Sequence, residues 1–235
     1  MNNHNFRVIP KNYFWLSVEG TDGAGKTSLL KEIERFLYTQ RKINFSIIKE
    51  FSDSSVGILI KKTIKEKNFF SLGNNFNHSF SETLLLCADF VYQFENILLK
   101  YPDKKNIFIF SDRGLHSFLT YQTLRIKYQY NITKPRYLQK WIKNIFQPFG
   151  TPDFIILLTS PLSDIKKRIK KRDGYIKTKE LRFIDDMQNE YVKIIKKSSI
   201  PHIVFKNHSG NFKNVKSEAI EIIKKIIFNK KNINN

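Results

Sequence analysis

The fold is decided by residues 13–37, which read YFWLSVEGTDGAGKTSLLKEIERFL. Residues 13–19 form a short apolar run that predicts a buried strand, and residues 27–37 predict a helix because apolar side chains recur at helical spacing. The side chains at this spacing are Leu29, Leu30, Ile33 and Leu37. Between strand and helix lies GTDGAGKT, residues 20–27, which matches the pattern G-x-x-x-x-G-K-[ST] in the context that the pattern requires.

This glycine-rich turn predicts a nucleoside triphosphate site. Glycines let successive backbone N–H groups point at phosphate oxygens, at the positive end of the following helix. The Lys26 ammonium is placed to reach the β- and γ-phosphates, and the Thr27 hydroxyl is a candidate ligand for Mg²⁺. We therefore expect ATP to bind with Mg²⁺ at Gly20, Thr21, Asp22, Gly23, Ala24, Gly25, Lys26, Thr27 and Ser28.

A second apolar run ends in charged residues that suit the same chemistry. Residues 106–111, NIFIFS, predict a buried strand, and Asp112 and Arg113 follow it. The Asp112 carboxylate can hold a Mg²⁺-bound water, and Arg113 can neutralise charge on a transferred phosphoryl group. An ordinary surface ion pair at a strand end is the alternative. On the first interpretation, Thr27 and Asp112 form the metal site.

Apolar runs alternate with amphipathic stretches along the rest of the chain. Strands are predicted at 45–49, 153–158 and 200–205, and helices at 79–99, 115–126 and 215–228. Ser160 and Pro161 predict the start of one more helix, as its N-cap and first-turn proline. Continuous apolar strands alternating with helices indicate a parallel sheet covered on both faces. We expect an α/β fold of the P-loop NTPase type, with three layers and a central parallel sheet of about five strands.

Composition narrows the possible functions. Hydrophobic residues make up 41% of the 235 residues, which excludes a disordered chain, and the single cysteine, Cys87, excludes a disulfide framework. No apolar run reaches the ~20 residues that span a bilayer. We therefore expect one domain, residues 13–229, in a cytoplasmic protein with no membrane partner. Residues 1–12 and 230–235 are expected to be flexible tails.

The charge is strongly basic, with 41 Lys and Arg against 21 Asp and Glu, a formal net charge of +20. A polyanionic partner such as nucleic acid is one explanation. However, lysine pairs such as Lys166-Lys167 and Lys196-Lys197 lie on the polar sides of helical patterns, without the interleaved aromatic residues of a stacking surface. Solvated helix faces explain the charge better, and nucleic acid is not expected as a partner.

Several segments, in order, resemble the thymidylate kinases, the dTMP kinases of the P-loop nucleoside monophosphate kinase group. Residues 14–30 look like the opening of that family, and residues 50–61 lie where it has E-P-G-G-T-x-x-G followed by I-R. Residues 84–89, LLLCAD, fall where it has L-L-F-A-A-D-R, and residues 112–122, DRGLHSFLTYQ, are similar to D-R-Y-x-x-S-x-x-A-Y-Q. The resemblance covers about residues 13–228, and the last motif together with the glycine-rich turn is specific to the family.

The resemblance implies transfer of the γ-phosphoryl group from ATP to dTMP, giving dTDP, in a homodimer. Asp22 would accept a hydrogen bond from the 3′-hydroxyl of the acceptor, Arg113 would align its phosphate, and Tyr121 would pack beneath its sugar. The whole acceptor site implied in this way consists of Asp22, Glu50, Lys61, Leu86, Phe90, Arg113, Ser117, Phe118, Tyr121 and Gln122.

The resemblance also implies a mobile lid. Gly23 and Ala24 leave the phosphate-binding turn without an arginine, so the catalytic cation would come from a basic, glycine-containing segment at about residues 170–178. Arg172 is the first candidate there, with Lys171 and Lys177 as reserves. The catalytic set is therefore Lys26, Arg113 and Arg172, and solvated surface charge is the alternative for the lid residues.

The departures from the family cluster on the acceptor side. Phe51 replaces a proline, Leu86 the aromatic residue that stacks on thymine, Phe90 an arginine, and Phe118 a small polar residue that hydrogen-bonds the base. Stacking can be restored by Phe90 or Phe118, and hydrogen bonding by Ser117 or Thr120. Two other functions therefore stay open: a kinase for a deoxynucleoside or another deoxynucleoside monophosphate, and a non-catalytic protein that binds nucleotide or nucleic acid. His116 is expected on the helix surface.

Overall fold

A computed structural model describes residues 13–40, 43–67, 70–72, 78–101, 107–132 and 136–233. Its sheet has five parallel strands in the order β2-β3-β1-β4-β5. The strands are β1 (Tyr13–Gly20), β2 (Asn44–Ile48), β3 (Ile107–Asp112), β4 (Phe154–Thr159) and β5 (His202–Lys206). Each lies within two residues of a predicted strand, so the predicted fold class is confirmed. Asn106, the predicted first residue of β3, lies outside the described residues.

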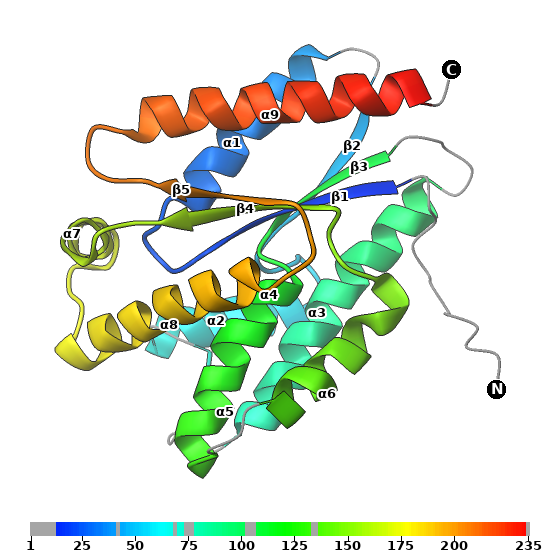
Figure 1. Ribbon diagram of the computed structural model, residues 1–235. Helices are drawn as coiled ribbons and strands as arrows, with labels where there is room; N and C mark the ends of the chain where they lie inside the picture. The colour runs from blue at the N-terminus through cyan, green and yellow to red at the C-terminus, as the bar shows by residue number, and fades with distance from the viewer. Residues whose placement is uncertain are drawn as a thin grey trace.

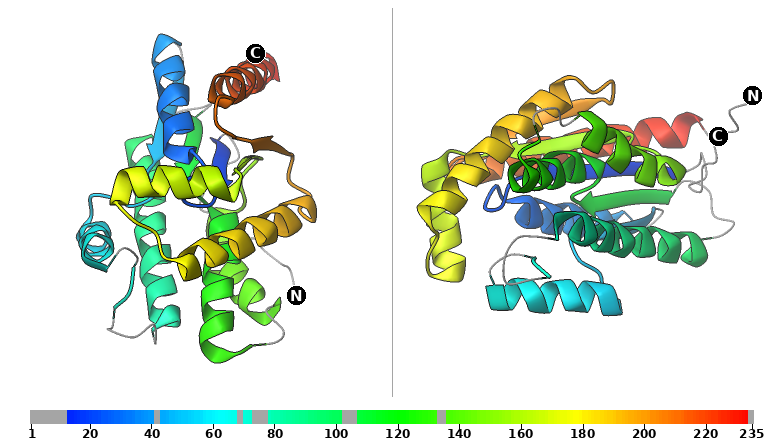
Figure 2. Two further views of the ribbon diagram at one scale, coloured as in Figure 1. Left: turned by 90° about the vertical axis from the view of Figure 1, so that its left-hand side faces the viewer. Right: turned by 90° about the horizontal axis from the view of Figure 1, so that it is seen from below.

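Helices cover both faces of this sheet. They are α1 (Lys26–Thr39), α2 (Ser55–Lys67), α3 (Ser79–Lys100), α4 (Leu115–Ser117), α5 (Thr123–Tyr130), α6 (Arg136–Phe146), α7 (Leu162–Asp173), α8 (Thr178–Lys196) and α9 (Phe212–Ile233). Figure 1 shows α1 and α9 above the sheet and α3, α6 and α8 below it. In both views of Figure 2, α2, in cyan, lies at the margin of the molecule beside α3.

Strand alternation explains the two cores. Successive side chains of a strand point to opposite faces of the sheet. Leu16 and Phe110 pack with α1 and α9 on one face, whereas Trp15 and Ile109 pack with α3 and α6 on the other. The indole Nε1 of Trp15 donates a 2.9 Å hydrogen bond to the Ser111 hydroxyl, which satisfies its polar atom inside the core.

The strand order places the functional segments together. β1 lies between β3 and β4. The chain that leaves β1 leads to β2 on one side of it, and the chain that leaves β3 leads to β4 on the other side, so these two connections leave the carboxyl edge of the sheet in opposite directions. Ligands of open α/β sheets bind in the crevice at this point. The glycine-rich turn follows β1, Asp112 ends β3, and Glu50 lies two residues beyond β2, so the three meet at one edge.

Several predicted details need correction. The helix after β4 begins at Leu162 with Pro161 at the N-cap position, and Ser160 does not cap it because its hydroxyl donates to Asn207 O at 2.6 Å. α9 continues to Ile233, into the predicted tail, because no glycine or proline interrupts it. The predicted helix at 115–126 contains a π-helix, Phe118–Gln122, between α4 and α5. Within the described ranges, no helix is both long and apolar enough to cross a membrane.

Candidate active site

The glycine-rich turn forms a closed cradle at the amino end of α1. Gly20, Gly23 and Gly25 have φ angles of 141°, 73° and 103°, which L-residues with side chains rarely adopt. A Cβ atom at Gly20 would overlap the Leu158 carbonyl oxygen of β4. Lys26 is buried, and its Nζ donates to Thr21 O at 3.0 Å. Burial lowers the pKa of Lys26, and the nearby Arg113 cation adds to this effect.

Side chains from α7 and from the segment after β5 hold the cradle from outside. Asn207 Nδ2 donates to Ala24 O at 2.7 Å, and Arg168 Nη1 donates to Gly23 O at 2.8 Å. Arg168 Nη2 also donates to Asn207 O at 3.0 Å, which ties the two supports together. These bonds hold the carbonyl oxygens of Gly23 and Ala24, and within the turn Ala24 N donates to Thr21 O at 3.3 Å.

Thr27 and Asp112 meet as predicted for a metal site. The Thr27 hydroxyl donates to Asp112 Oδ2 at 3.0 Å, and among the described residues the buried Oδ1 of Asp112 has no hydrogen-bond partner. Burial raises the pKa of Asp112, and the Glu50 carboxylate adds to the increase while Lys26 opposes it. A hydroxyl and an unpaired carboxylate oxygen are the hard oxygen donors that Mg²⁺ prefers, so this pair fits the metal.

Arg113 links this donor side to the acceptor side. Its Nε donates to Glu50 Oε1 at 2.5 Å, its Nη1 to Gly20 O at 2.8 Å, and its Nη2 to Asp22. Burial opposes its charge, but Glu50 and Asp22 hold the pKa of Arg113 above its ordinary value. Burial also works against the charge of Asp22, yet Arg113 and Lys26 keep the pKa of that carboxyl low. Both groups are therefore ionised at neutral pH.

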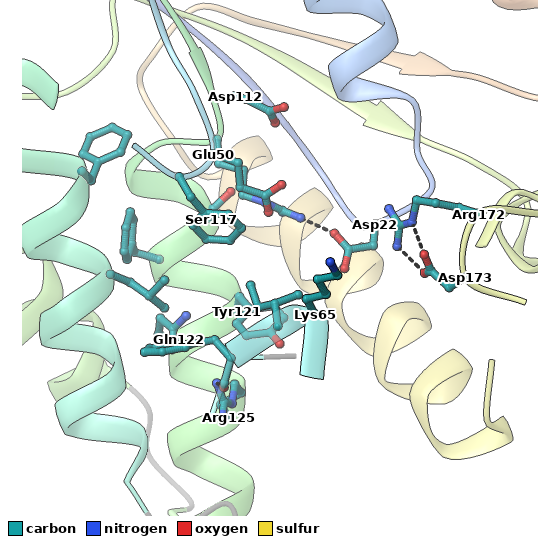
Figure 3. A pocket seen from close by; sticks show the side chains of 17 residues that line it. Asp22, Glu50, Lys65, Asp112, Ser117, Tyr121, Gln122, Arg125, Arg172 and Asp173 are labelled. Carbon is teal, nitrogen blue, oxygen red and sulfur yellow. Dashed lines mark hydrogen bonds and ion pairs between the residues drawn. The ribbon is translucent and has the colours of Figure 1, made fainter. Parts of the chain in front are cut away.

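A cavity of about 420 Å³ opens beside Arg113 (Figure 3). The predicted site residues that line it are Asp22, Glu50, Leu86, Phe90, Asp112, Arg113, Ser117, Phe118, Tyr121, Gln122 and Arg172. In Figure 3, Asp112 lies at one end and Gln122 and Arg125 lie toward the other. The cavity thus runs from the predicted metal site to a pocket deep between α3 and α5.

The wall of this pocket is aromatic where the family has polar residues. Phe90 and Phe118 pack edge to face with ring centroids 5.7 Å apart, and Phe118 also contacts Phe146 at 4.8 Å. Both rings line the cavity while they belong to the core below the sheet. Leu86 lies on the same wall. Aromatic surface for a flat base is therefore present, although the position that the family uses for stacking carries leucine.

The structure does not bring every predicted acceptor residue to the cavity. Lys61 Nζ pairs with Asp53 Oδ1 at 2.6 Å, and Lys61 is not among the residues that line it. One turn further along α2, Lys65 does line the cavity. Ser117 lines it too, but its hydroxyl donates to Glu19 Oε2 at 2.5 Å, and so its hydrogen is not directed at a base. Thr120 is fully buried and does not line the cavity.

Arg172, the first candidate for the lid cation, forms an ion pair with the adjacent Asp173. Arg172 donates from Nε and from Nη2 to the two carboxylate oxygens of Asp173, both at 2.7 Å. This pairing, with a further contribution from Asp22, raises the pKa of Arg172. Both residues line the cavity at the end of α7, whereas the reserve candidates Lys171 and Lys177 do not.

Six residues that line the cavity were not among the predicted site residues: Phe51, Ile64, Lys65, Phe70, Arg125 and Asp173. Arg125 donates to Glu82 Oε2 at 2.6 Å and to Phe70 O at 3.0 Å, so it fastens the segment 70–72 to α3 and α5. The signal for Arg125 was its place four residues after Tyr121, on the same side of one helical run. Phe70 gave no local signal.

His116 is buried rather than on the surface, because α4 packs into the core below the sheet. Burial lowers the pKa of His116 to about 4, and Lys143 and His202 contribute to the shift. The imidazole is therefore neutral near pH 7. It lies outside the set of residues that line the cavity, which gives it no contact with the predicted acceptor.

Comparisons with known proteins agree with this geometry. The family model described as thymidylate kinase matches residues 18–218. A probable thymidylate kinase of Sulfurisphaera tokodaii is 26% identical over 183 residues, covering 78% of this chain and 83% of that protein. A thymidylate kinase of Prochlorococcus marinus is 27% identical over 214 residues, covering 89% and 94%.

A solved structure shows the same fold. The crystal structure of thymidylate kinase from Ehrlichia chaffeensis superposes with a TM-score of 0.61 at 18% identity, over 90% of this chain and 98% of that one. The resemblance predicted from the sequence is confirmed by the family match and by these relatives. The chain therefore belongs to the thymidylate kinase family, the ATP-dependent nucleoside monophosphate kinases that phosphorylate dTMP to dTDP.

Proposed function

We propose that this protein transfers the γ-phosphoryl group of ATP to dTMP, with Arg113 as the group that joins donor and acceptor. The observation that carries the proposal is the position of Arg113. Its guanidinium contacts both the first glycine of the phosphate-binding turn and the carboxylates that border the acceptor cavity. A cation at this junction can align the acceptor phosphate with the transferred group, and alignment supplies much of the rate enhancement in phosphoryl transfer.

On the donor side, the inner N–H groups of the glycine-rich turn would hold the phosphates, and Lys26 would neutralise charge that develops on the transferred group. Lys26 leaves Thr21 O to do so, which costs little because a charged phosphate is a stronger acceptor than a backbone carbonyl. We propose Thr27 and Asp112 as the holders of Mg²⁺. When bound, the metal ion would neutralise phosphate charge and orient the donor.

On the acceptor side, the phosphate of dTMP would replace Glu50 or Asp22 as the partner of Arg113. Arginine binds phosphate in the same bidentate manner as carboxylate, so this exchange keeps the charge compensated. Asp22, whose pKa the Arg113 and Lys26 cations keep low against the effect of burial, would take the hydrogen bond of the 3′-hydroxyl. Tyr121 lines the cavity beside these groups, in the position proposed for contact with the sugar. The nucleophile is already anionic, so no general base is required.

Closure of the segment around residues 170–178 would bring the last cation. Arg172 lies at the end of α7, next to Asp22 on one side of the cavity (Figure 3). We propose that the anionic phosphates draw its guanidinium away from Asp173 and into the site. Gly174, with a φ of 85°, terminates α7 next to Arg172, and we propose that the backbone turns at this glycine when the segment closes. Closure also excludes water, which would otherwise hydrolyse ATP.

A measurement of ADP release with Mg²⁺-ATP and a panel of acceptors tests the proposal. The panel contains dTMP, dUMP, dCMP, dGMP and thymidine, because the aromatic wall at Phe90 and Phe118 also suits other bases. We expect dTMP to give the highest kcat/KM. Lys26→Ala should abolish the activity, whereas Lys31→Ala, on the exposed side of α1, should leave it within about twofold. Release with dTMP no faster than in Lys26→Ala would refute the proposal.

We also propose a homodimer through α2 and α3. Ile58, Leu59 and Leu84 on these two adjacent helices are 56%, 45% and 50% exposed, and together they support an apolar contact between copies. Light scattering after gel filtration should give twice the mass of the chain for the wild type and a single mass for Leu84→Lys. A wild-type monomer at micromolar concentration would contradict this proposal.

A further inference from the structure

A buried chain of hydrogen bonds runs from Arg113 into the core below the sheet. Arg113 Nη1 donates to the Tyr191 hydroxyl at 3.4 Å, and Tyr191 donates to the Ser117 hydroxyl at 2.7 Å. Ser117 in turn donates to Glu19 Oε2 at 2.5 Å. Tyr191 and Glu19 are fully buried, and Ser117 is 5% exposed. The four residues come from the segment after β3, from α8, from α4 and from β1.

The direction of every bond in this chain is fixed by its Arg113 end. A guanidinium can only donate, so the Tyr191 hydroxyl accepts from it. The single hydrogen of Tyr191 must therefore go to Ser117, and that of Ser117 must go to Glu19. Each hydroxyl accepts one bond and donates one, so the Tyr191 lone pairs stay directed at Arg113. Such a chain is strengthened by mutual polarisation in a medium of low dielectric constant.

The surroundings of Glu19 show that this chain is a tightly packed part of the fold. Its other oxygen, Oε1, accepts a 2.8 Å hydrogen bond from Ser17, so both carboxylate oxygens are satisfied by hydroxyls. A Cβ atom at Gly114 would lie 3.2 Å from Oε1, which is tighter than an ordinary contact, so a side chain there would require Glu19 to shift slightly. Burial raises the pKa of Glu19, while Ser117, Ser17, Arg113 and Lys26 act in the opposite direction.

Arg113 itself has a backbone that needs such support. Its φ of 75° lies in the left-handed region, which a residue with a long side chain adopts only where its surroundings impose it. Its N–H donates to Val18 O at 3.0 Å, which fixes the main chain but not the guanidinium. The carboxylates of Glu50 and Asp22 also hold the guanidinium, but the acceptor phosphate would take the place of one of them. The Tyr191 hydroxyl is a side-chain partner that the phosphate does not displace.

We infer that Tyr191, Ser117 and Glu19 are positioning residues that hold the Arg113 guanidinium in place for the acceptor phosphate. This inference rests on the proposed function, because it assigns the acceptor phosphate to Arg113. Tyr191 and Glu19 do not line the acceptor cavity, and Ser117, which does, directs its hydroxyl hydrogen to Glu19 rather than to a base. Loss of this relay of hydrogen bonds should therefore weaken the binding of a nucleoside monophosphate and leave the binding of the corresponding nucleoside unchanged.

Calorimetric titration of dTMP and of thymidine into Tyr191→Phe tests the inference. We expect the Kd for dTMP to rise about fivefold to tenfold, as for one weakened hydrogen bond to a charged group, and the Kd for thymidine to stay the same. Ser117→Ala should give the same pattern. The double variant should be no worse than either single one, since the relay is interrupted only once.

Tyr13→Phe is the matched control, because Tyr13 is also a buried tyrosine whose hydroxyl has one acceptor, Tyr101 O at 2.9 Å, far from the cavity. It should change neither Kd. Equal losses for dTMP and thymidine in Tyr191→Phe, or no loss for either, would overturn the inference. A wild-type protein that binds thymidine but gains nothing from the phosphate would refute the role of Arg113 in the proposed function itself.

Discussion

The ion pair between Glu82 and Arg125 gives the sharpest prediction about stability. It joins α3 to α5 at 2.6 Å, with 0% of the Glu82 side chain and 7% of the Arg125 side chain exposed. Glu82 Oε1 also accepts from Leu72 N at 2.9 Å, and Arg125 donates to Phe70 O. Arg125→Met leaves the carboxylate of Glu82 buried without its cation. Removal of one partner of a buried pair costs about 3–5 kcal/mol.

For a chain of this size, each kcal/mol corresponds to a shift of about 2–4 °C, so the unfolding midpoint of Arg125→Met should fall by roughly 6–20 °C. Scanning calorimetry measures the midpoint, and urea titration followed by circular dichroism measures the free energy of unfolding. The double variant Glu82→Leu/Arg125→Met should recover most of the loss, because apolar side chains of similar volume often replace a buried pair without cost. Lys224→Met, which removes an exposed pair with Glu221, is the control and should change the free energy by less than about 1 kcal/mol.

A loss below about 1 kcal/mol in Arg125→Met, equal to the loss in Lys224→Met, would refute the reasoning, because it would mean that water reaches the Glu82 carboxylate. If the double variant Glu82→Leu/Arg125→Met is as unstable as Arg125→Met, the reasoning about the unpaired carboxylate is also refuted. The defect would then lie in the bonds that Arg125 makes to the segment 70–72 rather than in an unpaired charge.

Three further predictions concern the cavity, the phosphate-binding turn and the core. Lys65→Met should raise the KM for dTMP about tenfold, whereas Lys61→Met should leave it within about twofold; equal effects in steady-state kinetics would contradict this placement. Arg168→Met should raise the KM for ATP about tenfold and spare that for dTMP, because it frees the Gly23 carbonyl; a rise in both values would argue against it. The pKa of His116 is lowered to about 4, so the unfolded state binds its proton first as the pH falls below 6.5. Between pH 7.5 and pH 5 the wild type should therefore lose about 2 kcal/mol more unfolding free energy than His116→Leu does. Urea titrations that give the same loss for both proteins would disprove the assignment.

The strands were predictable because a parallel sheet buried on both faces leaves an uninterrupted apolar run in the sequence. Helices were harder. No range was predicted for α2, α6 or α8. α6 carries its buried residues Leu138, Ile142 and Phe146 in one narrow stripe, among charged residues that resemble a solvated segment. The π-helix at Phe118–Gln122 could not be foreseen, since one extra residue per turn leaves no distinct trace in an apolar pattern.

In the candidate site, too, one part was predictable from the sequence and another was not. The phosphate-binding turn is a local structure, and its glycines, Lys26 and Thr27 lie where the sequence pattern placed them. The acceptor cavity is built from non-local pairs. Whether Lys61 or Lys65 faces it depends on the rotation of α2 about its axis, and Arg125 reaches Glu82 across 43 residues of sequence. Neither the rotation of α2 nor the pairing of Arg125 with Glu82 can be predicted from the neighbouring residues in the sequence.

The charges of the site show why the net charge of the chain is a poor guide to its ligand. The charged residues that line the cavity are the cations Lys65, Arg113, Arg125 and Arg172 and the carboxylates Asp22, Glu50, Asp112 and Asp173, and Lys26 lies in the turn beside them. Cations and carboxylates nearly balance here, so most of the basic excess of +20 lies elsewhere on the molecule. Phosphate binding at Arg113 is then an exchange of one anion for another, because Asp22 and Glu50 already occupy the guanidinium. An exchange of this kind favours a ligand that offers more than charge. Among anions that compete for Arg113, the one that also fills the aromatic pocket beside Phe90 and Phe118 gains the additional apolar contact, and inorganic phosphate does not.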